Sequence, residues 1–253
     1  MDVATYQSIL SYDGTAFAGF QRQARRRTVQ GEVEKALHQL GWRERALRGA
    51  GRTDTGVHAA GQVVAYELEW RSDPARLTRA LNALLPEDVA VVDTAPAPAG
   101  FRPRYDARWR RYRYRIIAAE TRVPLAERFA WRVWPAPDTG RMVQGAQALL
   151  GEHDFGAFGT APRRGSHTRR IIRRAEWLEE AQGASFVIEA DAFLYRMARR
   201  LTAALVAVGQ GRAPIETVAE HLAQPRRKWQ GSPAPAHGLC LEAVIFDDDR
   251  PDS

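Results

Sequence analysis

Gly51-Arg52-Thr53-Asp54-Thr55-Gly56-Val57-His58 is a polar segment in which one carboxylate lies between two glycines. Glycine-rich polar segments interrupt helices and form turns. Residues 46–48 before it have the character of a strand end, and residues 61–70 after it alternate in polarity, as a half-buried strand does. The sequence therefore predicts a tight loop between two strands, with Asp54 at its tip.

Two interpretations of Asp54 remain open at this level. An aspartate in such a loop commonly accepts hydrogen bonds from its own backbone. A loop anchored by two strands is also a rigid support for a reactive side chain. His58 lies four residues after Asp54, but the flanking glycines argue against a helix that would present both residues to a metal, and no third ligand is evident. We expect His58 to stabilise the loop.

Composition limits the class of protein. A chain of 253 residues that is 45% hydrophobic can bury one large core or two modest ones. No apolar run is long enough to span a bilayer, and Asp2 and Gln7 interrupt the segment where a secretory signal would lie. The single cysteine, Cys240, excludes an internal disulfide and a thiolate-based zinc site. We expect a cytoplasmic protein.

Charge indicates the partner. The net charge is +7 and the isoelectric point is near 10. Only Lys35 and Lys228 are lysines among the 37 basic residues, so the surface is rich in arginine, whose planar fork binds phosphate and stacks on bases. Clusters lie outside the expected helices and strands, at residues 25–27, at Arg163, Arg164, Arg169 and Arg170, and at residues 226–228. A polyanionic partner is expected.

The segment 108–117 has the pattern of a strand whose two faces differ. The alternation sends Tyr112, Tyr114 and Ile116 to one face and Arg111, Arg113 and Arg115 to the other. Either the tyrosines belong to the core and the arginines to a solvated face, or the strand offers an aromatic platform for a base beside a phosphate-binding face.

The remaining patterns predict an α+β protein made of two related units, because both halves mix sheet and helix in the same proportion. We expect a domain boundary near residues 95–100, which are rich in alanine and proline, and place the domains at 1–102 and 103–253. Expected helices are 28–41, 74–85, 139–150, about 194–208 and one before Leu222; further strands are 6–12, 89–92, 129–134, 171–178, 185–190 and 239–245.

Several motifs occur in the order found in one family. They are Tyr12-Asp13-Gly14, GFQRQ at 19–23, TVQGE at 28–32, the 51–58 loop followed by Gln62, Asn82 to Pro86 with Asp88, RYRY at 111–114, DFGAF at 154–158, the helix around Met197 to Arg199, and Gly238-Leu239. Over essentially its whole length the chain resembles the tRNA pseudouridine synthase A family. Thr55 and Arg200 depart from the residues common there, alanine and asparagine, so the helix phase decides whether Arg199 or Arg200 faces Asp54.

The resemblance implies a fold, a function and roles for residues. The implied fold has two similar domains, each a mainly antiparallel sheet flanked by helices, with the active cleft between them. It implies isomerisation of uridine to pseudouridine at positions thirty-eight, thirty-nine and forty of the tRNA anticodon stem-loop, by a homodimer that needs no metal and no organic cofactor. It implies that Asp54 is the catalytic aspartate and that Arg52 helps to displace the target base. It further implies that Tyr112 stacks on uracil and that Arg199 pairs with the aspartate.

The chemistry is compatible with such residues, and two rival classes are distinguishable from it. Breaking the C1′–N1 bond builds positive charge on the sugar, which a nearby carboxylate stabilises. The carboxylate would attack C1′, add to C6 or remove the C2′ proton. An RNA-binding module would not need Asp54. A nucleoside or glycoside hydrolase would need a second catalytic carboxylate, and only the distant Glu67 and Glu69 are evident.

Overall fold

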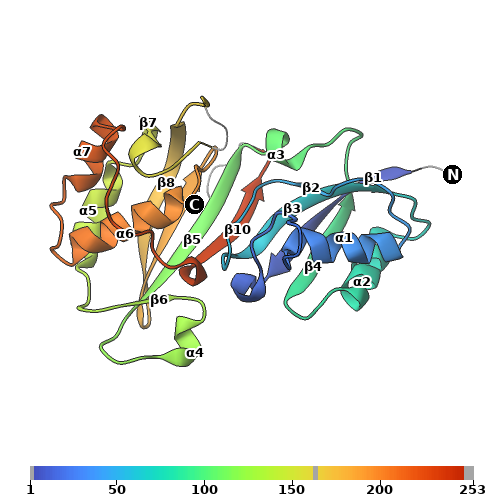
Figure 1. Cartoon of the computed structure of the whole chain (residues 1–253), viewed down its shortest axis with the longest axis horizontal. Helices are drawn as coiled ribbons and strands as arrows, with labels where there is room; N and C mark the ends of the chain where they lie inside the picture. Colours follow the sequence, from blue (N-terminus) through green and yellow to red (C-terminus); the bar gives the residue numbers. More distant parts are fainter. Residues whose placement is uncertain (1–2, 162–164, 248–253) are drawn as a thin grey trace. The chain divides into compact units, whose positions relative to one another are not determined.

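A computed structural model describes residues 3–161 and 165–247 of the chain. The chain divides into two compact units. The first unit is made of residues 1–108 and 241–253, and the second of residues 109–240. Each unit is described by itself, and Figure 1 shows the elements of both. The protein is mixed α and β with mainly antiparallel strand pairing, as the sequence predicted.

The first unit is built on the strand order β4-β1-β3-β10. β1 pairs antiparallel with both β3 and β4, and β2 adds to β3. Figure 1 shows α1 and α2 over one face of this sheet. The elements are β1 (Ala4–Tyr12), α1 (Val29–Gln39), β2 (Arg48–Gly49), β3 (His58–Leu68), α2 (Pro74–Leu84), β4 (Val89–Pro96), α3 (Pro103–Asp106) and β10 (Leu239–Ile245).

Both long helices of this unit begin where the sequence predicted. The Thr28 hydroxyl accepts from the Gly31 amide at the start of α1, and the Asp73 carboxylate accepts from the Arg76 amide at the start of α2. Each helix packs an apolar face into the core, where Leu37 of α1 and Leu77 of α2 are fully buried. Leu84, the last residue of α2, is exposed.

The second unit is built on the strand order β5-β9-β8-β7, with every neighbouring pair antiparallel, and β6 parallel to β5. Met142 of α5 and Leu201 and Leu205 of α6 are fully buried. The elements are β5 (Trp109–Ala118), α4 (Pro124–Glu127), β6 (Trp131–Val133), α5 (Thr139–Gln147), β7 (Gly151–Asp154), β8 (Arg169–Glu180), β9 (Gly183–Ala190), α6 (Met197–Gly209) and α7 (Thr217–Ala223). The described residues also form 3₁₀ turns at Gly14–Ala16, Phe155–Ala157 and Ala236–Gly238.

The division of the chain differs from the expected domains at 1–102 and 103–253. The segment 95–100, expected as a junction, begins inside β4, which pairs with β1 as far as Pro96. Proline is tolerated there because β4 is an edge strand. The last strand belongs mostly to the first unit, since β10 lies next to β3 and the Arg108 amide donates to Ile245 O at 2.8 Å.

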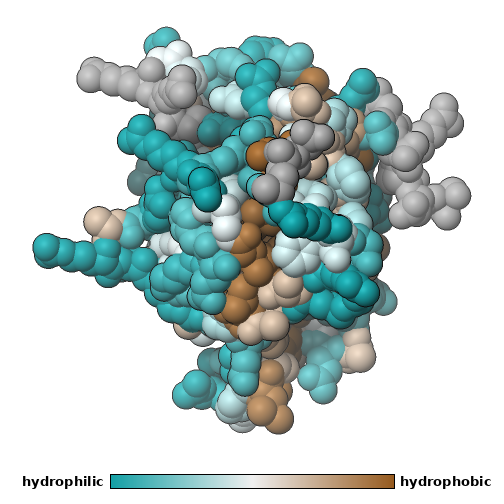
Figure 2. All heavy atoms as spheres, turned by 90° about the vertical axis from the view of Figure 1, so that its right-hand side faces the viewer, coloured by the Kyte–Doolittle hydropathy of each residue, from teal (hydrophilic) through white to brown (hydrophobic). Residues whose placement is uncertain are grey.

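Figure 2 shows a face covered largely by hydrophilic side chains, with a narrow hydrophobic band across it. Within the described residues, no helix combines the length and apolar character needed to cross a bilayer.

Candidate active site

The loop 51–58 is fixed at both of its ends. At its start, the Ala50 amide donates to Val63 O at 2.8 Å and the Gln62 side-chain amide donates to Gly51 O at 2.9 Å. At its end, the Val57 amide donates to Asp54 O at 3.1 Å and closes a turn. The predicted tight loop between two strands is therefore present, and Asp54 begins its turn.

Thr53 ties the residue before Asp54 to the interior. Its hydroxyl lies 2.8 Å from the Tyr12 hydroxyl, and its carbonyl accepts the Phe20 amide at 3.1 Å. Both hydroxyl-bearing side chains are buried. With its side chain and its carbonyl both bonded, Thr53 has little freedom to rotate, so the direction of Asp54 is set by the fold.

Two glycines allow the N-terminal turns to approach the loop closely. A Cβ on Gly14 would lie 2.0 Å from Val57 O, and one on Gly19 would lie 2.8 Å from Thr53 O. Gly19 also has φ +95°, a conformation in which glycine is favoured. The loop thus packs against the segments Tyr12–Gly14 and 19–23. The sequence showed these segments only as separate motifs.

His58 connects the end of the loop to the first turn. It is buried, and the Gly14 amide donates to its Nδ1 at 3.0 Å. The same nitrogen lies 3.1 Å from Asp13 Oδ1. These contacts confirm that His58 stabilises the loop. No cluster of three or more His, Cys, Asp or Glu side chains suited to a metal ion occurs in the described part of the chain.

Arg52 and Asp54 flank the buried Thr53 and differ from it in exposure. The Arg52 side chain is exposed and makes no hydrogen bond or ion pair with any residue that the structure describes, whereas Asp54 is partly exposed. Because alternate residues of an extended segment face the same way, burial of Thr53 turns both neighbours toward the surface. An acid and a cation are thereby presented side by side.

Tyr112 lies on β5 in the second unit. The residue is 8% exposed, and its ring packs edge-on against Phe193, with the centroids 4.8 Å apart. Tyr114 is fully buried, and burial raises the pKa of its phenol well above the ordinary value. Both tyrosine rings lie in the core or at its edge. This placement agrees with the interpretation in which the tyrosines of the strand belong to the core.

Arg199, on α6, is held by contacts with the main chain of Ala234. Its Nε donates to Ala234 O at 2.7 Å, and the Ala234 amide donates to Arg199 O at 3.1 Å. The Tyr114 hydroxyl donates to the adjacent Pro235 O at 2.8 Å. Arg200 instead lies 3.5 Å from Phe158 O, and burial lowers the pKa of its guanidinium. The two arginines thus have separate environments within the unit.

The arginine side chains on one face of β5 are bonded to acids and to a hydroxyl of the same sheet. Arg111 Nε donates to the fully buried Glu189 at 2.8 Å, Arg113 bonds the Ser185 hydroxyl at 2.9 Å, and Arg115 lies 3.5 Å from Glu180. Arg173 also bonds Glu189. Because these arginines already have partners within the sheet, this face of β5 is a poor phosphate-binding surface.

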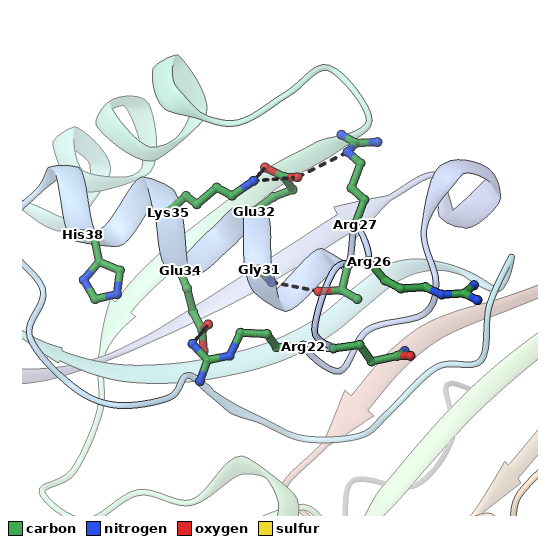
Figure 3. Close-up of a pocket in the computed structure, with 10 residues that line it drawn as sticks. Arg22, Arg26, Arg27, Gly31, Glu32, Glu34, Lys35 and His38 are labelled. Carbon is green, nitrogen blue, oxygen red and sulfur yellow. Dashed lines mark hydrogen bonds and ion pairs between the residues drawn. The ribbon is translucent and has the colours of Figure 1, made fainter.

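The cluster at residues 25–27 divides into a structural and an available part. Arg27 forms two bonds to Asp88, at 2.6 and 2.8 Å, and so serves the fold. Arg26 makes no ion pair with the described residues and lines a cavity of about 270 Å³ together with Arg22, Lys35 and His38 (Figure 3). Glu32 and Glu34 pair with the other cations there.

The other two clusters are also partly committed. Arg169 pairs with Glu152 at 2.7 Å, Arg170 is buried, and Lys228 donates to Gly156 O. Arg163 and Arg164 lie outside the described residues.

Comparison with known proteins decides the family. The sequence profile described as tRNA pseudouridine synthase matches residues 9–106 and 146–247. The chain is similar to "tRNA pseudouridine synthase A" of Myxococcus xanthus, at 42% identity over 96% of this chain and 92% of that protein, and of Frankia casuarinae, at 44% identity over 95% and 88%. The chain belongs to the tRNA pseudouridine synthase family.

The chain is therefore an isomerase of the pseudouridine synthase class. A relative from Geobacter sulfurreducens, also named tRNA pseudouridine synthase A, is 40% identical over 96% of this chain and 99% of its own length. The matched ranges of the tRNA pseudouridine synthase profile contain the 51–58 loop and Arg199, whereas Tyr112 lies between them. The Tyr12–Thr53 contact has no signal in the sequence, because it joins residues 41 positions apart.

Proposed function

We propose that this tRNA pseudouridine synthase acts on uridines at positions thirty-eight, thirty-nine and forty of the anticodon stem-loop, with Asp54 as its catalytic carboxylate. Membership of the family supports the reaction class. The observation that carries the assignment of Asp54 is the fixed loop. Thr53 is bonded through both its hydroxyl and its carbonyl, and the adjacent Asp54 carboxylate lies on a turn at a partly exposed position.

A fixed carboxylate suits the chemistry of the isomerisation. The C1′–N1 bond of uridine breaks, the uracil turns, and a C5–C1′ bond forms, so the sugar carries positive charge while the base is detached. A carboxylate near C1′ stabilises that charge. It acts by attack on C1′, by addition to C6, or by removal of the C2′ proton. One carboxylate suffices because no water is consumed.

The proposal gives roles to three further residues, two in RNA binding and one in the charge state of Asp54. Extrusion of a base from its stack costs about a few kcal/mol. The exposed Arg52, beside Asp54, occupies the vacated space and holds a neighbouring phosphate. Tyr112 stacks on the extruded uracil, and Arg199 pairs with Asp54 and keeps it ionised.

The test is to map pseudouridine in tRNA treated with the purified protein. The wild-type protein should form it at the three named positions. Asp54→Asn should abolish turnover and still bind tRNA, whereas Asp93→Asn, an exposed carboxylate on β4, should remain active. Turnover by the Asp54→Asn protein would defeat the assignment. Release of free uracil would favour a hydrolase, and binding without any product would favour an RNA-binding module.

A second test separates two roles of Tyr112. In this proposal the Tyr112 ring stacks on the base, and its oxygen, acting as the phenolate, accepts the C5 proton in the final step and becomes the phenol. Tyr112→Phe keeps the ring, so a lower kcat with an unchanged KM is expected. Full activity in the Phe variant would remove the proton-acceptor role and leave stacking.

We also propose that the protein acts in the cytoplasm as a homodimer. The single cysteine suits a reducing compartment. Light scattering of the purified protein, with and without tRNA, tests the dimer, and a mass equal to one chain under both conditions would contradict it.

A further inference from the structure

We propose that Tyr195 and Arg196 form a second RNA-binding element, which holds a nucleotide of the RNA substrate other than the uridine that reacts. The inference rests on the proposed function, in that the substrate is RNA. Its basis is an exposed aromatic ring and an available guanidinium at consecutive positions, immediately before α6.

Tyr195 presents its ring to solvent from a fixed backbone. The residue is 52% exposed, unlike the buried Tyr112 and Tyr114. The Tyr195 amide donates to Thr160 O at 3.0 Å, in an isolated β-bridge. A ring held in this way loses little conformational freedom when a base stacks on it, and base–aromatic stacking is tolerant of base identity.

Arg196 lies against this ring. Its guanidinium carbon is 4.8 Å from the centroid of Tyr195, and no ion pair or hydrogen bond of its side chain occurs among the residues described. Its backbone is left-handed, with φ +61°, so the chain turns sharply here and α6 begins only at Met197. A planar cation next to an aromatic ring matches the phosphate and base of one nucleotide.

The positive charge around Tyr195 and Arg196 favours the binding of an anion. Arg196, Arg199 and Arg200 lie within five residues at the start of α6, and no acidic residue occupies the first turn of that helix. Cations at the start of a helix face the positive end of its dipole, and like charges in one turn repel. A phosphate placed beside Arg196 would offset both effects.

The position of the pair relates it to the proposed uracil site without making it part of that site. Phe193, which packs edge-on against Tyr112, precedes Tyr195 by two residues, and Arg199 follows Arg196 by three. The turn 193–196 therefore runs from the ring proposed to stack on uracil to the exposed ring of Tyr195. A nucleotide near the target uridine in the RNA chain is the occupant.

The first experiment measures tRNA affinity and single-turnover rate for the full-length protein. Tyr195→Ala should weaken tRNA binding by about 5- to 100-fold, the range expected for loss of one stacked base. Tyr195→Phe, which keeps the ring, should restore binding. At saturating enzyme, the rate of pseudouridine formation should be unchanged in both variants, because the reacting uridine is held elsewhere.

The second experiment tests the cation through salt dependence. Arg196→Ala should lower the slope of log affinity against log salt by about 0.7 to 0.9, the value for one phosphate contact. Arg122→Ala is the matched control, since Arg122 is exposed on the same unit and has no partner in the described part of the chain. An equal change in both variants would assign the effect to net charge and overturn the proposal.

Other outcomes also decide. Unchanged tRNA affinity of Tyr195→Ala overturns the inference, and so does a change in the native mass of that variant, which would make the surface a protein interface. If the wild-type protein forms no pseudouridine in any tRNA, the proposed function fails. A weaker affinity of Tyr195→Ala for RNA would in that case still support the element.

Discussion

Thr53 shows how a single side chain sets the direction of its neighbour. Its hydroxyl and carbonyl are bonded to Tyr12 and Phe20, on segments more than 30 residues away in sequence. Each bond contributes only about 1 kcal/mol to stability. Their effect on activity is expected to be larger, because displacement of a catalytic group by an ångström costs about 100-fold in rate.

We therefore expect Thr53→Val to lower kcat by about 10- to 100-fold with little change in KM, because valine keeps the volume and removes the bond to Tyr12. Thr53→Ser keeps the hydroxyl and should retain most of the activity. Steady-state kinetics on a tRNA substrate, together with thermal unfolding, provide the comparison. A variant that loses stability but keeps kcat would show that the bond is merely structural.

Gly14 and Gly51 form a matched pair of glycines on the same loop system. Gly14→Ala places a Cβ 2.0 Å from Val57 O, so we expect a lower unfolding temperature, by the equivalent of about 1–3 kcal/mol, and a loss of activity. Gly51→Ala meets no atom within 4 Å and should be tolerated. Calorimetry and turnover assays of both proteins test this, and equal stability would contradict the packing argument.

At the scale of elements, three strands of the second unit meet at one buried carboxylate. Glu189 on β9 bonds Arg111 on β5 and Arg173 on β8, and its own side chain is fully buried. Removal of one member of a buried ion pair leaves charge without compensation. Strand pairing and charge pairing are thus coupled at this point of the sheet.

Glu189→Gln should destabilise the protein by about 3 kcal/mol, because two arginines would then share a neutral partner. Glu176→Gln is the control, since Glu176 pairs with Arg174 at 3.0 Å in a more exposed position and should change stability by less than about 1 kcal/mol. Urea unfolding gives both values. Equal effects of the two substitutions would show that burial of Glu189 is unimportant.

The turn Ala236–Gly238 carries a histidine that should make stability depend on pH. Burial lowers the pKa of His237 below its ordinary value, while a bond to the Ala130 backbone and the charge of Glu127 oppose that shift. The unfolded chain therefore binds a proton at a higher pH than the folded chain. Stability from this group is complete above about pH 6.5 and is lost as the pH falls through the lowered pKa.

The measurement is the difference in unfolding free energy between the wild-type protein and His237→Gln. The free energy of unfolding of the wild type, relative to that of the variant, should fall as the pH is lowered from about 7.5 to about 5.5. The reason is that only the wild type takes up a proton at this site when it unfolds. A difference that stays constant across this range would rule out the assignment to His237.

At the scale of the whole molecule, charge rather than fold predicts the affinity of the protein for RNA. The net charge is +7, but Arg27, Arg111 and Arg169 are engaged by acids. Only part of the arginine content is therefore available to phosphate. Affinity should still be set largely by the release of counterions.

We expect tRNA affinity to fall by about 1,000-fold or more between 50 and 200 mM salt if six or more phosphates are contacted. Filter binding over a salt series measures the slope. An affinity that does not change with salt would mean that the arginine clusters do not contact the RNA backbone.

The sequence by itself determined the class of fold, most elements and the family. The helix starts at Thr28 and Asp73 were readable because a cap and its helix are neighbours in the chain. The alternation in β5 was readable for the same reason, since a strand repeats every two residues. The loop 51–58 and the loop-stabilising role of His58 also followed from local spacing.

Tertiary structure alone decided which distant residues meet. No local pattern could reveal that Tyr12 bonds Thr53, that Glu189 pairs with Arg111 of β5, or that the last strand joins the first unit. Helix and strand periods depend on the backbone and act over a few residues. Pairing across 40 or more residues depends on which surfaces the folded chain brings together, and that is a property of packing rather than of sequence spacing.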